Sequence, residues 1–372
     1  MRVICLQENL AAALLVVERA VPQRSAIQSL GYILFDARAD GLRLVATNQE
    51  LTISQTVASQ VLSTGAVALP ARLVAEFVSN LRAGPIEFDL DRTAWSVRFA
   101  STPYSAHVKG LDPADYPIVP SAPDREVMTA SEADLLTTIN QVAFAAAADM
   151  NQPQLASVGI TISRHQLIMA ATDGMRLAMR PCPLIQAAVR ERRLLLPARS
   201  LTELARLLRN ANDPVAIAVS AQSNQVHFRL QQVELTSRII DGDQPNYEKV
   251  IPTTQKTSVT IGRYDLAEAV LLASYFARDV ADRIKIEVRP GGEDEIRVTA
   301  EGGASGDNAG TLPAAIKGPG LRIGMKAEFL SDVLNSRGGE TVVLHFTSPL
   351  AACRVEFPDD IDYVHVLMPI RL

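Results

Sequence analysis

Cysteine is scarce in this sequence, and its placement excludes two classes of site. The three cysteines, Cys5, Cys182 and Cys353, lie far apart and form neither a CxxC pair nor a cluster with histidine. An odd number of isolated cysteines is typical of a reducing compartment and supplies no set of metal ligands. We therefore expect a cytoplasmic protein without disulfides, a metal ion or another cofactor.

Long hydrophobic runs are also missing. The longest apolar run near the N-terminus, residues 10–17, has eight residues, whereas a membrane-spanning helix needs about 20. Glu8 and Glu18 flank this run, and its large apolar residues recur at helical spacing. This pattern favours an amphipathic helix over a signal peptide. We therefore expect no membrane segment.

The sequence has no strong excess of either charge. Its net charge is −5, and 48% hydrophobic with 21% charged residues is the composition of an ordinary globular protein. The net charge argues weakly against a protein whose whole surface binds nucleic acid. It allows local basic surfaces, because an oligoanion responds to the local electric field. The length of 372 residues suggests two or three domains.

An internal repeat organises the chain. The tetrapeptide LPAR at residues 69–72 recurs at residues 196–199, which is 199 − 72 = 127 positions later, and a further step of 127 reaches Lys326. Each of the three positions precedes an apolar pattern with helical period. Solenoid repeats are about 20–50 residues long, so units of this length are complete domains.

Each repeat also contains an earlier helical pattern and several short runs with period-2 alternation, such as TVVLHF. These signals predict an α+β domain with two helices and antiparallel strands. Proline-broken segments end the first two copies, as linkers commonly do. We therefore predict three domains at residues 1–124, 125–254 and 255–372.

Basic residues recur at matching positions of the repeat. A basic residue begins the expected second helix of each copy: Arg72, Arg199 and Lys326. An arginine follows the end of each of these helices: Arg82, Arg209 and Arg337. A cation at a helix N-terminus opposes the helix dipole, which indicates selection for another purpose. Three equivalent basic surfaces suit duplex DNA, held through its phosphates without sequence specificity. The alternative is an ordinary solvated surface.

Simple geometry predicts two chains around such a duplex. If two helices per domain line a hole at ~10 Å spacing, one chain leaves an opening of only ~10 Å. Duplex DNA is roughly 20 Å across. Two chains in a head-to-tail ring leave an opening of roughly 30 Å, which would pass the duplex.

Three motifs resemble those of a known family. ATDGMRLA begins at residue 171, DGDQPNYEKVIP begins at residue 241, and MPIRL occupies residues 368–372. Together with the three domains, they resemble the bacterial DNA polymerase III beta subunits, the sliding clamps. The resemblance implies a ring-shaped homodimer without catalytic activity that encircles double-stranded DNA. It also implies partners: DNA polymerase III subunits, the clamp loader and other proteins with a clamp-binding motif.

The resemblance implies three sets of functional residues. A pocket for short partner peptides containing Gln and Leu or Phe would be formed by Leu155, Thr172, Gly174, Met175, Arg176, Leu177, Pro245, Val250, Val366, Leu367, Met368, Pro369, Ile370 and Arg371. DNA contacts would add Arg24, Asn151 and Gln152 to the six basic residues above. The dimer interface would include Ala106, Val108, Tyr275 and Phe276. The chain departs from the family pattern at Met175, where histidine is common, and in the loop of residues 25–30.

Two other functions remain open from the residues alone. The first is a hydrolase or nuclease that uses Asp173, although an Asx-type turn beside Gly174 explains this aspartate more simply. The acidic residues 293–295 lie in a glycine-rich hairpin, and the segment 301–310 lacks the GK[ST] of a phosphate-binding loop. The second is a scaffold that binds proteins but not DNA.

Overall fold

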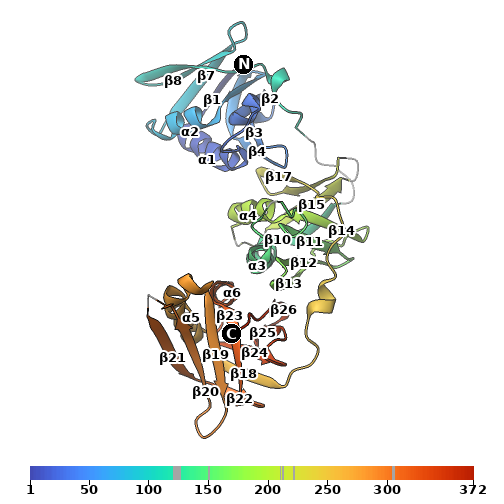
Figure 1. Ribbon diagram of the computed structural model, residues 1–372. Helices are drawn as coiled ribbons and strands as arrows, with labels where there is room; N and C mark the ends of the chain where they lie inside the picture. The colour runs from blue at the N-terminus through green and yellow to red at the C-terminus, as the bar shows by residue number, and fades with distance from the viewer. Residues whose placement is uncertain (120–126, 150, 210, 212, 221–222, 304–305) are drawn as a thin grey trace. The chain divides into compact units, whose positions relative to one another are not determined.

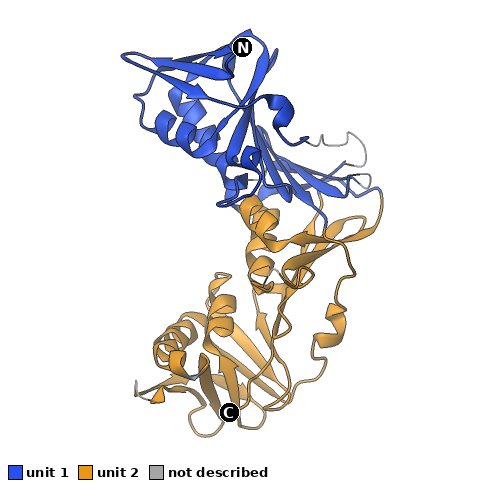
Figure 2. Cartoon of the chain, turned by 45° about the horizontal axis from the view of Figure 1, so that its top comes forward, with its two compact units in different colours: residues 1–132, 185–189, 206–239 blue, residues 133–184, 190–205, 240–372 orange. Residues whose placement is uncertain are grey.

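A computed structural model describes the whole chain except residues 120–126, 150, 210, 212, 221–222 and 304–305. The described chain divides into two compact units, each taken here by itself (Figure 2). Unit 1 comprises residues 1–132, 185–189 and 206–239, and unit 2 comprises residues 133–184, 190–205 and 240–372. The predicted boundary between residues 124 and 125 lies outside the described residues.

Unit 1 contains two antiparallel sheets and a pair of helices (Figure 1). The five-stranded sheet has the order β5 (Ser59–Ser63), β1 (Arg2–Leu6), β7 (Pro85–Asp91), β8 (Ser96–Ser101) and β9 (Tyr104–Lys109). The eight-stranded sheet has the order β10 (Val127–Ser131), β15 (Pro214–Ser220), β16 (Gln225–Arg229), β17 (Val233–Arg238), β4 (Leu51–Val57), β3 (Gly41–Thr47), β2 (Tyr32–Arg38) and β6 (Gly65–Pro70). Helices α1 (Gln7–Val17) and α2 (Ala71–Ser79) pack against each other.

Unit 2 repeats this combination of sheets and helices. Its nine-stranded sheet has the order β14 (Arg192–Pro197), β11 (Ser157–Ile162), β12 (Gln166–Thr172), β13 (Arg176–Pro183), β26 (Asp360–Leu367), β25 (Cys353–Phe357), β24 (Thr341–Phe346), β18 (Thr257–Gly262) and β22 (Ala315–Lys317). Its four-stranded sheet has the order β21 (Asp307–Pro313), β20 (Glu295–Glu301), β19 (Arg283–Arg289) and β23 (Leu321–Lys326). Helix α5 (Arg263–Ala277) packs on β19, β20, β21 and α6 (Ala327–Asn335).

The remaining helices complete the predicted set of two in each repeat. They are α3 (Glu132–Val142) and α4 (Ala198–Leu207). The first helix of each copy directly follows a strand, as α1 follows β1, α3 follows β10 and α5 follows β18. The α+β prediction with antiparallel sheets is therefore confirmed.

The second helix of each repeat begins at a strand end, but the third copy is out of register with the prediction. Helix α2 begins one residue after β6, and α4 begins one residue after β14, so that Arg72 and Arg199 are both second residues of their helices. The third helix begins only at Ala327, which makes Glu328 its second residue. The prediction that Lys326 occupies the equivalent position was wrong, because the third copy is two residues longer before this helix.

Among the described residues, no helix combines the length and apolar character that crossing a bilayer would need.

Candidate functional site

The turn between β12 and β13 is held by its own side chains. The Thr172 hydroxyl accepts the N–H of Gly174 at 3.0 Å and donates to the carbonyl oxygen of Arg176 at 2.6 Å. One carboxylate oxygen of Asp173 accepts the N–H groups of Met175 and Arg176 at 2.9 and 3.0 Å. Gly174 has φ of +89°, a conformation that L side chains rarely adopt. The predicted Asx turn at Asp173 is confirmed.

The same turn occurs at the equivalent position of the first repeat. Thr47 ends β3, and the side chain of Asn48, the next residue, accepts the N–H groups of Glu50 and Leu51 at 3.0 and 2.7 Å. The Thr47 hydroxyl accepts the N–H of Gln49 at 3.0 Å and lies 3.2 Å from the carbonyl oxygen of Leu51. An asparagine thus performs the role of Asp173, so this role requires a hydrogen-bond acceptor and no ionisable acid.

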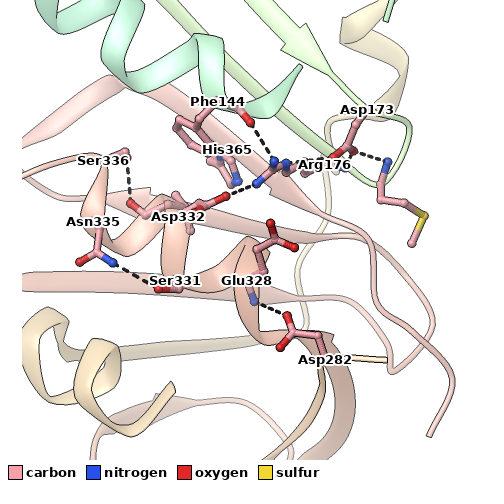
Figure 3. A network of polar contacts seen from close by, with 12 residues as sticks. Phe144, Asp173, Arg176, Asp282, Glu328, Ser331, Asp332, Asn335, Ser336 and His365 are labelled. Atoms are coloured by element: carbon pink, nitrogen blue, oxygen red, sulfur yellow. Dashed lines mark hydrogen bonds and ion pairs between the residues drawn. The ribbon is translucent and has the colours of Figure 1, made fainter. Parts of the chain in front are cut away.

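Arg176 fixes the base of the turn to two other elements of unit 2 (Figure 3). Its Nε donates to the second carboxylate oxygen of Asp173 at 3.0 Å, and its Nη1 donates to Asp332 of α6 at 2.5 Å. Its Nη2 donates to the carbonyl oxygen of Phe144 at 2.8 Å. The side chain is 8% exposed, so Arg176, expected as a wall of the pocket, is buried at the base of the turn.

A buried histidine lies beside this guanidinium. His365 on β26 is fully buried, stacks on Phe144 with 5.7 Å between ring centroids, and lies 3.1 Å through Nδ1 from the Tyr363 hydroxyl. Burial, with a smaller contribution from the charge of Arg176, lowers the pKa of His365 to about 3. The imidazole is therefore neutral at physiological pH.

Two predicted pocket residues form an apolar cluster. Leu177 and Val366 are paired across β13 and β26, each 1% exposed, and they form this cluster with Ala170. Tyr247 and Ile251 pack against it from the segment that follows β17. Leu177 and Val366 therefore form the floor of the candidate site, and they offer a ligand almost no surface of their own.

The other residues predicted for the pocket differ in their exposure. Met175 and Val250 are 36% and 47% exposed. Leu155 and Pro245 are half-buried. Pro245 also lines a cavity of about 350 Å³ together with Ala170, Met179 and Tyr247. This cavity was not predicted from the sequence.

The last residues of the chain are attached to this region. The N–H of Met368 donates to the carbonyl oxygen of Met175 at 2.8 Å, and the N–H of Ile370 donates to Gly324 of β23 at 2.9 Å. Leu367 is buried, Pro369 is half-buried, and Arg371 is exposed. We call the surface formed by Met175, Val250 and Met368 around the buried cluster the peptide pocket.

The predicted DNA-binding residues differ in their exposure to solvent. Arg24, Arg82, Asn151, Gln152, Arg199 and Arg209 are exposed. The side chain of Arg72 is 88% exposed and pairs with Glu76 at 3.1 Å, which is an exposed pair of small energetic weight. Lys326 is half-buried, and its Nζ lies 4.8 Å from the ring centroid of Phe329.

Arg337 has a structural role that the sequence did not reveal. Its guanidinium and that of Arg180 both bind one carboxylate oxygen of Asp360, whose side chain is 6% exposed. Burial, followed by the nearby charge of Arg180, lowers the pKa of Arg337. A buried carboxylate needs such partners, so this ion pair explains the position of Arg337 without DNA.

The predicted dimer residues are only partly exposed. Ala106 is half-buried and Val108 is 5% exposed, although both lie on β9, which is an edge strand. Tyr275 is 52% exposed and Phe276 is half-buried. Sequence reasoning missed the larger apolar face of α5, which is formed by Tyr264, Leu271, Leu272 and Tyr275, each 47 to 66% exposed. Helical spacing of these exposed residues was the available signal.

No group of three or more His, Cys, Asp or Glu side chains suited to a metal ion occurs within the described part of the chain. The three cysteines are free and buried.

Comparisons with known proteins match the chain along almost its whole length. Residues 1–120, 129–246 and 248–371 match the profiles of the N-terminal, central and C-terminal domains of the DNA polymerase III beta subunit. The beta sliding clamp of Synechocystis sp. is 27% identical over 398 aligned positions that cover all of both chains. The beta sliding clamp of Bacillus subtilis is 24% identical and covers 95% of each chain.

Solved structures give the same result for the fold. The DNA polymerase sliding clamp from Bacillus subtilis superposes with a TM-score of 0.95 at 24% identity, covering 100% of this chain and 99% of that one. The DNA polymerase III beta subunit from Pseudomonas aeruginosa gives a TM-score of 0.92 at 22% identity, with complete coverage of both chains. This chain has the three-domain clamp fold and belongs to the DNA polymerase III beta subunit family, the sliding clamps of DNA replication.

Proposed function

We propose that this chain forms a head-to-tail homodimeric ring in the cytoplasm, encircles duplex DNA and tethers DNA polymerase III subunits, the clamp loader and other partners to it. The observation that carries the proposal is the match of all three clamp domains, in order, along one chain. The three domains proposed from the repeat, at residues 1–124, 125–254 and 255–372, would each contribute two helices and a basic surface.

The DNA-facing surface in this proposal has Arg72 and Arg199 as its central residues. Both are exposed second residues of their helices, where a cation opposes the helix dipole. Arg24, Arg82, Asn151, Gln152 and Arg209 would add contacts, and Lys326 would contribute less because it is half-buried. Phosphate contacts of this kind would hold DNA without reading its sequence.

Partner proteins would bind through a short peptide in the peptide pocket. An apolar floor with exposed Met175 and Val250 and half-buried Met368 at its margin suits Leu or Phe side chains. Methionine adapts its shape to different apolar partners, which suits a pocket shared by several proteins. Peptide Leu and Phe would therefore occupy this margin, while the buried cluster supports it.

The ring would close between the edges of two sheets. Strand β9 is an edge of the five-stranded sheet, and β21 is an edge of the four-stranded sheet. Edge strands carry unpaired backbone groups that can bind a second chain. We propose that β9 of one chain pairs with β21 of the next, with the apolar face of α5 buried beside β21.

The protein would act without catalysis of its own. The Asp173 carboxylate is already bound by two backbone N–H groups and by Arg176, which leaves it poorly placed as a general base. This proposal is tested against a nuclease by incubating the purified protein with plasmid DNA and Mg²⁺ or Mn²⁺. Cleavage that disappears in Asp173→Asn would support the enzyme instead.

Retention on DNA tests the ring itself. Loaded onto a nicked circular plasmid by a clamp loader, the protein should remain bound through gel filtration and should dissociate after the circle is linearised. Equal retention on linear and circular DNA would contradict encirclement. No retention on either, despite peptide binding, would favour a protein scaffold.

A further inference from the structure

The turn that forms one side of the peptide pocket has an exposed tip and a buried base. Gly174 has no atom within 4 Å of the position where a Cβ would lie, and Met175 beside it is exposed. At the tip, the backbone of Met175 is held by the bond of its N–H to Asp173, within the turn itself. The place of the whole turn relative to other elements depends on its base, where Met368 binds the carbonyl oxygen of Met175 and Arg176 binds three separate groups.

An arginine is not needed to form this turn. The equivalent turn of the first repeat has the same side-chain to backbone hydrogen bonds, and Leu51 occupies the position of Arg176. Leu51 is 2% exposed, so an apolar side chain satisfies the fold there. The guanidinium in the second repeat therefore serves something other than closing the turn.

The contacts of Arg176 indicate what it adds. Asp332 lies on α6, 156 positions along the chain, and Phe144 lies in the segment after α3. The guanidinium carbon also lies 4.4 Å from the ring centroid of Phe329 on α6 and 5.5 Å from that of Phe144. Directional hydrogen bonds and ring contacts on a planar group fix both its position and its orientation.

We infer that Arg176 and Asp332 are positioning residues for partner binding: together they hold the turn against α6 and so set the place of Met175 at the margin of the peptide pocket. This inference rests on the proposed function of that pocket. Arg176 is too buried to contact a peptide directly, and Asp332 acts through Arg176. Peptide affinity should therefore depend on a pair of residues that the peptide does not touch.

The test measures binding of a fluorescein-labelled synthetic peptide with a Gln-Leu-Phe clamp-binding motif by fluorescence anisotropy, with the full-length protein. Asp332→Asn should weaken binding about 3- to 10-fold, because it removes the charge that holds Nη1. Arg176→Lys should have an effect of similar size, because lysine cannot make three directed contacts at once. Asp332→Glu, which keeps the charge, should restore most of the affinity.

Two controls separate positioning from general stability. Glu328→Gln removes a carboxylate one turn earlier on α6, where the side chain is exposed. Arg263→Gln removes a buried guanidinium that binds the carbonyl oxygens of Leu334 and Gly339 at 2.7 and 2.8 Å, so it should lower the melting temperature. Both variants should bind the peptide within twofold of wild type.

The inference is overturned if Asp332→Asn binds like wild type, or if Arg263→Gln weakens binding as much as Asp332→Asn does. Wild-type protein that does not bind the peptide at all would overturn the proposed pocket and this inference with it. Wild-type binding together with an unaffected Asp332→Asn would leave the pocket standing and remove only the positioning role.

Discussion

The backbone N–H of Met368 and the carbonyl oxygen of Met175 form a hydrogen bond of 2.8 Å. This bond extends the pairing of β13 with β26, in which Leu177 lies opposite Val366. Chain ends usually fray, yet this one is attached to a turn nearly two hundred positions earlier. Met368 is therefore held beside the turn that we propose as one side of the peptide pocket.

Deleting residues 368–372 should abolish binding of the clamp-binding peptide, because it removes Met368 and its bond to the turn. Deleting only residues 371–372 keeps the hydrogen bonds of Met368 and Ile370 and should bind the peptide within about threefold of wild type. Fluorescence anisotropy measures both. Equal affinity of the longer deletion and wild type would exclude the C-terminal segment from the pocket.

Exposed and buried pocket residues should respond differently to substitution. Val250→Ser should weaken peptide binding by about 1–2 kcal/mol without changing the melting temperature, because Val250 is 47% exposed. Leu177→Ala should instead lower the free energy of unfolding by about 2–5 kcal/mol, because Leu177 is 1% exposed. Ile185→Ser, at an exposed position of unit 1, is the matched control for binding. A stable Leu177→Ala protein would contradict its place in the floor.

Charge on α5 should prevent the dimer. Leu271→Asp combined with Leu272→Asp should give a monomer of 40.2 kDa, because burying two carboxylates in an interface costs several kcal/mol. Leu350→Asp, at an exposed leucine elsewhere in unit 2, should leave the dimer intact. Light scattering after gel filtration gives the mass. A doubly substituted protein that stays dimeric would exclude the α5 face as the interface.

Reversing the two exposed helix-start charges should weaken retention on DNA. Arg72→Glu with Arg199→Glu should shorten the lifetime on nicked circular plasmid and reduce its dependence on salt, because fewer phosphates are contacted. Surface substitutions of this kind usually change stability by about ±0.5 kcal/mol. Arg98→Glu, an exposed arginine on β8, is the control. Unchanged lifetimes across the salt series would exclude these two residues.

The buried His365 should make unit 2 less stable in mild acid. Its native pKa is about 3 and its unfolded pKa is about 6.5, so between these values the unfolded state binds one more proton than the native state. Stability therefore falls as the pH drops below about 6.5, by about 2 kcal/mol between pH 7 and pH 5.

His365→Phe should remove this part of the pH dependence, and His107→Gln, at an exposed histidine, should not. Urea denaturation at pH 7 and pH 5 gives the free energies of unfolding, and comparing each variant with wild type cancels the other titrating groups. An equal loss of stability in wild type and His365→Phe would show that His365 is not the group responsible.

Some site residues could be predicted from the sequence because their roles are local. An Asx turn needs only a carboxylate or amide beside a residue that accepts positive φ, and Asp173-Gly174 supplies both. The apolar face of α5 could also have been predicted, from the helical spacing of its apolar residues, but it was missed. The structural role of Arg337 could not be predicted, because its partner Asp360 lies on β26, 23 positions further along the chain.

The sequence by itself determined the repeat, the two helices of each copy and the start of the second helix in the first two copies, since periodicity, prolines and turn residues act over a few positions. Only the tertiary structure decided that Arg176 is buried against Asp332 and that Leu177 is buried in the apolar cluster beneath the candidate site. It also decided that Lys326 precedes α6 instead of lying within it. The reason is physical. Burial and ion pairing depend on side chains that folding brings together from distant positions, and no local sequence pattern indicates which residues these will be.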